Sequence, residues 1–252
     1  MGSNPTSGIE PHSASVTGMC GRFTLTRPDP DALRLRFDLP ATAQIEEQPR
    51  FNISPTTEVL AVRAQPVDPA VEGAEGVREV GRLRWGLVPH FADPDDFDRL
   101  LINARSETVA EKPSFRSSFA GRRCLVLADG FYEWKRDETG KHPYFFSRPG
   151  REPFAFAAIW DRAERSSGEP LFSCSLITCE ASSVVEPVHH RMPVILDGPE
   201  AEAEWLEHEA DPDSLTVLMK PTEDLEAREV DEAVNSSRVE GPQLLEPPLR
   251  LT

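Results

Sequence analysis

The chain has 252 residues, of which 38% are apolar, so it is long enough to bury a core within one large domain or two small ones. Its 43 acidic and 27 basic residues give a net charge of −16, which argues against general binding to nucleic acid because a polyanion repels an acidic surface. No run of about 18 apolar residues is present, which excludes a membrane-spanning helix.

The first 18 residues are rich in Gly, Ser, Pro and Thr, which predicts disorder. They lack the basic and apolar regions of a secretory signal. The four cysteines contain no C-x-x-C pair, and Cys124 and Cys174 lie in apolar runs typical of a core. We therefore expect a cytoplasmic protein. Residues 1–18 fit a start codon assigned too far upstream, an added tag or a natural extension, and we expect Met19 to be the true start.

Strand patterns outnumber helix patterns along the rest of the chain. Residues 20–25 are typical of an opening strand, and residues 28–37 of a short helix. Residues 64–80 are rich in Pro, Gly and acids, which indicates a hairpin loop. Further strands are predicted at residues 58–63, 81–88, 123–128, 131–135, 144–147, 154–159 and 171–178, and a second helix at 199–209. The absence of β–α alternation favours a single α+β domain built on antiparallel sheet.

Met19-Cys20 is the most informative pair of residues. If Met19 is removed, Cys20 becomes N-terminal and carries an amine and a thiol on adjacent carbons. The ordinary pKa values of these groups, about 7.7–8.0 and about 8.5, leave both partly available near neutral pH. An aldehyde condenses with such an amine to an imine, and the thiol then closes a thiazolidine ring. A small buried apolar residue at the start of a strand is the alternative.

Two segments carry groups suited to proton transfer. Glu133 lies between Tyr132 and Trp134, and apolar surroundings raise the pKa of a carboxyl group. Strand alternation instead predicts an exposed Glu133, on the face opposite both neighbours. His189 and His190 are adjacent, so on an extended chain they point in opposite directions and one of them can face a cleft. One exposed and one core histidine is the alternative, and the stronger expectation for an arbitrary pair.

Asn103 and Arg105 have the same parity on a strand, so they can line one face. An Asn amide orients polar groups, and an Arg guanidinium binds phosphate. An ordinary polar loop is the alternative for this segment.

Six motifs occur in order along the chain, and together they are specific. They are Met19-Cys20-Gly21-Arg22-Phe23, Phe51-Asn52-Ile53-Ser54-Pro55, Arg84-Trp85-Gly86-Leu87-Val88-Pro89, Ile102-Asn103-Ala104-Arg105-Ser106-Glu107-Thr108, Ala128-Asp129-Gly130-Phe131-Tyr132-Glu133-Trp134 and His189-His190-Arg191-Met192-Pro193. The chain thereby strongly resembles the SRAP (SOS response-associated peptidase) family, the abasic-site processing proteins, over about residues 19–247.

The resemblance implies one α+β domain at residues 19–247, mainly antiparallel and barrel-like with short flanking helices, followed by a tail at 248–252. It also implies a sensor of abasic sites in single-stranded DNA that forms a protective thiazolidine crosslink through its N-terminal cysteine. It implies neither a metal nor a cofactor, and we expect a monomer that does not bind membranes.

The resemblance also assigns roles by position. It implies that Cys20 is the crosslinking residue, that Asn103 orients the sugar, that Glu133 is the acid–base carboxylate and that His189 is the active-site histidine. It assigns no role to His190. We further expect Arg22, Arg105 and Arg191 to bind backbone phosphates, and Trp85 and Phe91 to pack against bases, with core packing as the stronger expectation for Trp85.

Two other functions stay open. With residues 1–19 attached, the Cys20 nitrogen is an amide and cannot form an imine. Cys20, His189 and Glu133 could instead form a cysteine autopeptidase that removes the preceding residues. A non-catalytic module that binds single-stranded DNA is the third hypothesis. For any DNA-binding function, the acidic balance requires a locally basic groove or a high cellular salt concentration.

Overall fold

The structure is a computed structural model that describes residues 21–64, 77–208 and 210–248. Its strands are β1 (Arg22–Leu25), β2 (Arg50–Ile53), β3 (Glu58–Ala64), β4 (Arg78–Trp85), β5 (Asn103–Arg105), β6 (Arg123–Ala128), β7 (Gly130–Asp137), β8 (Gly140–Ser147), β9 (Phe154–Glu164), β10 (Pro170–Glu180), β11 (Arg191–Pro193) and β12 (Glu226–Glu229). Its helices are α1 (Pro30–Arg36), α2 (Arg116–Gly121), α3 (Pro199–Leu206) and α4 (Pro212–Leu218), with 3₁₀ turns η1 (Pro149–Arg151), η2 (Glu232–Asn235) and η3 (Pro242–Leu245). Within these described segments, no helix has the length and apolar character needed to cross a membrane.

The larger of two sheets closes into a barrel. β4 pairs with β3, β3 with β6, β6 with β9, β9 with β10, and β10 returns to β4. These pairings are antiparallel except for β10 with β4, and β5 also lies parallel to β10. The prediction of a mainly antiparallel, barrel-like α+β domain is confirmed, and the two parallel pairings add a feature that the sequence did not suggest.

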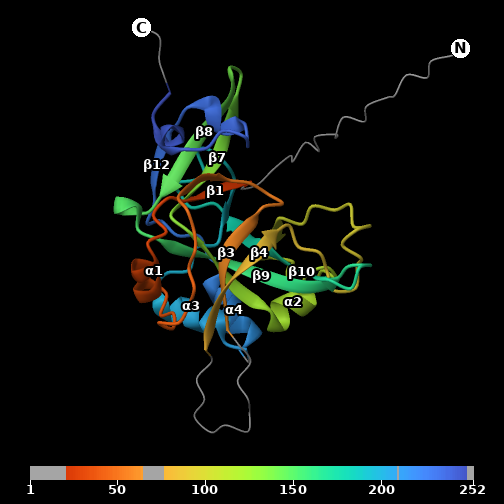
Figure 1. Cartoon of the computed structure of the whole chain (residues 1–252). Coiled ribbons are helices and arrows are strands. Elements are labelled where there is room, and N and C mark those ends of the chain that lie inside the picture. Colours follow the sequence, from red (N-terminus) through yellow and green to blue (C-terminus); the bar gives the residue numbers. More distant parts are fainter. Residues whose placement is uncertain (1–20, 65–76, 209, 249–252) are drawn as a thin grey trace, which may run out of the picture.

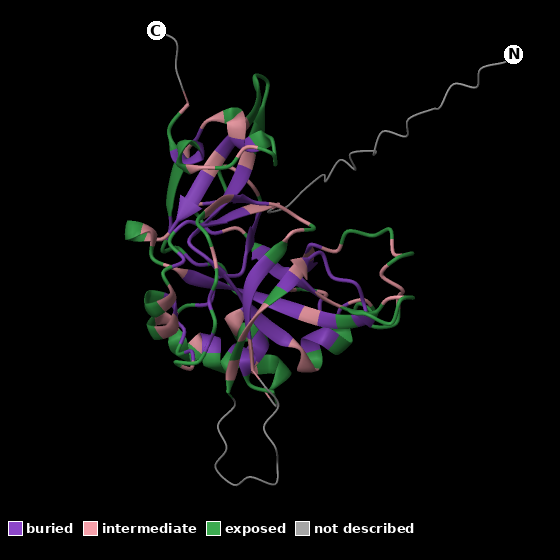
Figure 2. Ribbon diagram, viewed as in Figure 1, coloured by how far each residue is buried: buried purple, intermediate pink, exposed green. Residues whose placement is uncertain are grey.

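The smaller sheet has the strand order β12-β8-β7-β1-β2. Figure 1 shows β7, β8 and β12 at one end of the molecule, with α2, α3 and α4 at the other end of the barrel. The buried residues follow the strands through the interior, and the exposed ones lie mostly on helices and loops (Figure 2). All of β6 is buried, as predicted for a central strand.

The chain changes sheets between β6 and β7, which correspond to the strands predicted at residues 123–128 and 131–135. Asp129 lies at the change and is completely buried. Its carboxylate accepts hydrogen bonds from the Thr24 hydroxyl and from the Thr26 amide and hydroxyl, each at 2.6 Å. At Gly130, a Cβ atom would lie 2.2 Å from the Phe145 ring, so only glycine fits.

Arg123 joins two helices to the barrel. It is 5% exposed and begins β6. Its guanidinium donates to carbonyls at the end of α2, those of Phe119 at 2.7 Å and Ala120 at 2.8 Å. It also donates to the Trp205 carbonyl of α3 at 2.8 Å and to that of Glu207. One cation therefore satisfies carbonyl groups that two helix ends leave without intrahelical partners.

The remaining differences from prediction lie in short or polar segments. The predicted helices at 28–37 and 199–209 are confirmed as the shorter α1 and α3. β2 forms at residues 50–53, where no strand is predicted, and β4 begins inside the stretch expected to be a loop. Most of that stretch, residues 65–76, lies outside the described residues. β12 has the sequence Glu-Ala-Arg-Glu at a sheet edge, which carries no apolar alternation to reveal a strand.

Candidate functional site

The start of β1 lies beside the part of β7 that carries Glu133. The two strands are antiparallel, with Arg22 opposite Tyr132 and Phe23 opposite Phe131. Continuing this register by one residue sets Gly21 opposite Glu133. Cys20 directly precedes Gly21 in the sequence and lies outside the described residues.

Glu133 is a buried carboxylate, with only 3% of its surface exposed. The first four residues of β7 are all buried, so both faces of the strand are covered there and the expectation of an exposed Glu133 is wrong. Lys141 lies near this carboxylate. Burial and the positive charges of Arg136 and Arg22 lower the pKa of Lys141, and the charge of Glu133 opposes them.

The C-terminal segment 232–239, hereafter the strap, covers the start of β1. The Arg22 guanidinium donates to Asn52 Oδ1 and to the Val234 carbonyl, both at 2.8 Å. The amide of Asn52 donates to the carbonyls of Ser236 at 2.9 Å and Val239 at 2.8 Å. Asn52 is 4% exposed, so a buried side-chain amide joins the first strand, the second strand and the strap.

The strap also reaches β7, next to Glu133. The indole Nε1 of Trp134 donates to Asn235 Oδ1 at 2.7 Å. The ammonium of Lys141 lies 4.3 Å from the centre of the Trp134 ring, which is close enough for a cation–π interaction. The Trp134 side chain is therefore held between the strap and the β7–β8 hairpin.

Asn103 begins β5, which lies parallel to β10 with Asn103 opposite Leu176. Ala104 is completely buried, whereas Asn103 is half-buried and Arg105 is exposed. This pattern agrees with the expectation that Asn103 and Arg105 share one face of a strand.

Trp85 contacts both the start of β5 and β1. The prediction that it contacts DNA bases is wrong. The ring is completely buried, so it cannot contact a nucleic acid. Its Nε1 donates to the Ile102 carbonyl at 2.9 Å, directly before Asn103. Its ring packs edge-on against Phe23, with centroids 5.1 Å apart. Phe91, in contrast, is 63% exposed.

His189 lies in the turn that precedes β11. The Arg191 amide donates to His189 Nδ1 at 3.1 Å, and the His189 amide donates to the Val185 carbonyl at 3.0 Å. The rings of His189 and His190 lie side by side with centroids 4.5 Å apart, so the expectation of opposite directions is wrong. That expectation assumed an extended chain, and the chain turns here instead.

The surroundings of His189 lower its pKa. Burial is the largest cause; the main chain of Arg191 opposes it, and the positive charges of His190, Arg191 and Arg136 add to it. Arg136 belongs to β7, the strand of Glu133. A charge on that strand therefore contributes to the lowered pKa of His189.

Arg191 is held within the protein rather than exposed on its surface. Its guanidinium forms a two-pronged ion pair with Glu107, with Nη2 to Oε2 at 2.9 Å, and donates to the Thr178 carbonyl at 2.7 Å. The bonds to Arg191 are the main reason that the pKa of Glu107 is lowered. Among the three arginines predicted to bind phosphate, Arg105 is the exposed one, and all three assignments stay predictions.

Three cysteines are unsuited to act as nucleophiles. Cys124 and Cys174 are completely buried, as predicted, and Cys179 is 3% exposed. Burial raises the pKa of each thiol, to about 12 for Cys179. A thiolate is the nucleophilic form, so these thiols stay unreactive near neutral pH.

Sequence reasoning gave no role to several residues that shape this region. Asn52 belongs to a recognised motif, and its polar side chain next to apolar residues was a usable signal. Asn235 and Lys141 gave no such signal, because their contacts join segments far apart in the chain.

Comparisons with known proteins identify relatives of this chain. A sequence model described as SOS response associated peptidase (SRAP) matches residues 19–237. The abasic site processing protein YoqW of Bacillus subtilis (strain 168) is 37% identical over 233 residues, which cover 90% of this chain and 99% of that protein. The abasic site processing protein HMCES of Gallus gallus is 38% identical over 189 residues, which cover 66% of this chain and 56% of that protein.

Solved structures share the fold. A Bacteroides thetaiotaomicron protein has a TM-score of 0.77 at 24% identity, over 91% of this chain and all of that one. A Bordetella bronchiseptica protein has a TM-score of 0.67 at 26% identity, over 84% of this chain and all of that one.

Proposed function

The chain belongs to the SOS response associated peptidase (SRAP) family, and from this premise we propose that it processes abasic sites in single-stranded DNA by bonding covalently to the lesion through Cys20. The names of the two curated relatives support the substrate. The main support for this mechanism is the register of β1 and β7. It sets Gly21, the residue after Cys20, opposite the buried carboxylate of Glu133.

The proposed reaction uses both nucleophiles of an N-terminal cysteine. The Cys20 amine attacks the C1′ aldehyde of the ring-opened sugar, and the resulting carbinolamine loses water to give an imine. The Cys20 thiol then adds across the C=N bond: sulfur bonds to C1′, the π electrons move to nitrogen, and nitrogen takes up the thiol proton, which closes a five-membered thiazolidine. The net change is two new bonds to C1′ and the release of one water molecule. Glu133 takes a proton from the amine and returns one to the departing hydroxyl.

Asn103 and His189 are proposed to act on the sugar. The amide of Asn103 orients its hydroxyl groups, and Arg105, exposed on the same strand, binds a flanking phosphate. His189 is neutral near pH 7 because its surroundings lower its pKa. A neutral imidazole can transfer protons to and from the sugar oxygen as the ring opens.

This mechanism requires a free amine at Cys20. In the full chain the Cys20 nitrogen is an amide, so residues 1–19 must be absent from the reactive form. The family match begins at Met19, which supports a reactive form in which Cys20 is the first residue.

A second candidate function is self-cleavage before Cys20. The description of the family as a peptidase and the 19 residues that precede Cys20 favour this candidate. If purified full-length chain loses residues 1–19 without added protease, and Cys20→Ala does not, self-cleavage is supported. If only an added aminopeptidase exposes Cys20, this candidate is rejected.

The test of the main proposal compares two lesions. The chain beginning at Cys20 is incubated with a single-stranded oligonucleotide that carries an abasic site, or with the same oligonucleotide after borohydride reduces the aldehyde to an alcohol. A denaturation-resistant adduct should form only with the aldehyde. Glu133→Gln should slow its formation at least tenfold, and Glu138→Gln, an exposed change on the same hairpin, should not. Equal adduct from both lesions would overturn the proposal.

A further inference from the structure

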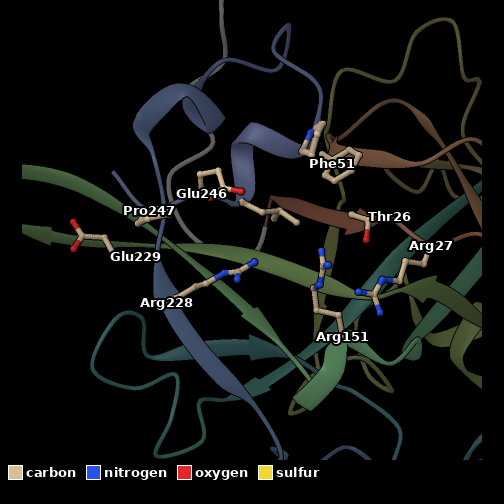
Figure 3. Close-up of a pocket in the computed structure, with 10 residues that line it drawn as sticks. Thr26, Arg27, Phe51, Arg151, Arg228, Glu229, Glu246 and Pro247 are labelled. Carbon is tan, nitrogen blue, oxygen red and sulfur yellow. The ribbon is translucent and has the colours of Figure 1, made fainter. Parts of the chain in front are cut away.

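Three arginines line one wall of a concave pocket, far along β1 from Gly21. The pocket has a volume of about 500 Å³. Arg27 follows β1, Arg151 ends η1, and Arg228 belongs to β12. In Figure 3 their guanidinium groups lie along one side of the pocket, and Phe51 and Glu246 lie on the other side.

These three arginines differ from nine others in this acidic protein, whose charges are paired. Arg34, Arg36, Arg63, Arg82, Arg122, Arg148, Arg162, Arg165 and Arg191 form ion pairs with carboxylates. Arg27, Arg151 and Arg228 form none within the described part of the chain. In a chain with a net charge of −16, three such cations gathered in one pocket indicate a site for an anion.

The three side chains are held in different ways. Arg27 Nη1 donates to the Gly150 carbonyl at 3.1 Å, and the Arg228 guanidinium lies 5.1 Å from the centre of the Phe145 ring. Arg151 has a φ of 57°, in the left-handed region that favours glycine. An arginine at a strained position is best explained by what its side chain does there.

The two carboxylates that line the pocket lie away from its three arginines, so an anionic ligand can reach the guanidinium groups. Glu229 points away from the arginines in Figure 3, and its Oε1 lies 3.9 Å from His142 Nδ1. Glu246 lies across the pocket, on the side of Phe51. A ligand that spans the pocket would therefore meet cations at one end, and a hydrogen-bond acceptor and an aromatic ring at the other.

We propose that this pocket binds a nucleotide. Its phosphate contacts Arg27, Arg151 and Arg228, its base packs near Phe51, and an amino group on the base donates to Glu246. The volume suits a ligand of this size. The site is separate from the proposed reaction, because the five residue-to-residue steps from Gly21 to Thr26 span about 16 Å of extended chain. The nucleotide is either free in solution or one unit of a DNA strand.

Binding of dCMP to the chain beginning at Cys20 tests the proposal, measured by calorimetry and by NMR of the arginine side chains. Deoxycytidine, which lacks the phosphate, should bind at least tenfold more weakly. Arg228→Gln should weaken dCMP binding at least fivefold. Arg151→Gly should do the same while relieving backbone strain, so its loss of binding cannot arise from unfolding. Arg162→Gln, an exposed arginine on β9, makes the same change in net charge and should have no effect.

An undamaged oligo(dC) strand distinguishes the two sources. If dCMP binds as described, the ligand is a free nucleotide. If only oligonucleotide binding falls in Arg228→Gln and Arg151→Gly relative to Arg162→Gln, the ligand is a unit of a DNA strand. The proposal is overturned if neither ligand responds to the two variants, or if deoxycytidine binds as tightly as dCMP.

Discussion

The ionisation of His189 is set by its position in a turn rather than by its neighbours in sequence alone. Its ring is half-buried beside the His190 ring, and burial is the largest cause of its lowered pKa. The positive charges of Arg191 and Arg136 act in the same direction. Near pH 7 the ring is therefore neutral, as a proton acceptor must be.

An NMR titration of His189 should have a midpoint below the ordinary histidine value of about 6.5. The folded state then binds fewer protons than the unfolded state between the two pKa values. The contribution of His189 to stability is complete above about pH 6.5 and is lost as the pH falls through the lowered pKa. His189→Gln identifies the resonance, and His208→Gln must leave it unchanged. A midpoint above 6.5 would contradict this account.

The sequence predicted the burial of some single residues better than that of others. The flanking aromatic residues of Glu133 suggested a buried carboxylate, but strand alternation suggested the opposite. Alternation fails because both faces of β7 are covered at this point, and the covering segments come from distant parts of the chain. Trp85 shows the reverse case, because its burial was the stronger expectation and only the contact with bases had to be corrected.

Among the elements, the strap depends on one buried amide. Asn52 accepts from Arg22 and donates to two strap carbonyls, so its three hydrogen bonds need both ends of an amide. Asn52→Asp keeps the acceptor for Arg22 but replaces the donor with an oxygen that faces two carbonyl groups.

We expect Asn52→Asp to lower the free energy of unfolding by about 2 kcal/mol, because two buried acceptors lose their donor. Trypsin should also cleave faster after Arg238, which is exposed within the strap. Urea denaturation and timed digestion measure the two effects. Gln48→Glu adds the same charge at an exposed site and should change neither. If trypsin cleaves Asn52→Asp at the same rate as the wild type, the amide does not hold the strap.

The second element-scale prediction concerns Arg123, which donates to the ends of α2 and α3. Arg123→Lys keeps the charge but cannot reach both sets of carbonyls. It should lower the free energy of unfolding by about 3 kcal/mol, since several charge-assisted hydrogen bonds are lost. Guanidinium denaturation measures this loss. Arg116→Lys, exposed on α2, is the matched control, and an equal effect of both changes would disprove the role of Arg123.

Some strands and pairings could be predicted from the sequence, and others could not. Apolar runs revealed β6, β9 and β10, which form much of the barrel. They did not reveal β12, whose residues are charged, or the parallel pairing of β5 and β10, which depends on segments about 70 residues apart. The strap is equally hidden, because its contacts are hydrogen bonds to strands at the other end of the chain.

For the whole molecule, net charge is the dominant electrostatic property. At −16, mutual repulsion of the acidic residues destabilises the compact state at low ionic strength. The melting temperature should therefore rise as sodium chloride increases from about 10 mM to about 0.5 M, where the Debye length falls to a few ångströms. Thermal unfolding followed by circular dichroism measures this, with sucrose at matched osmolality as the control. A melting temperature that falls steadily with salt would contradict this account.

The central claim is that both the amine and the sulfur of Cys20 bond to the abasic site. Intact mass spectrometry of the chain beginning at Cys20, after reaction with an abasic oligonucleotide and heating without reductant, tests it most directly. We predict an adduct whose mass is the sum of the two reactants minus one water. Neither Cys20→Ser nor a chain that retains Met19 should give this heat-stable product. An equally stable adduct from the chain that retains Met19, or one formed without loss of water, would contradict the thiazolidine mechanism.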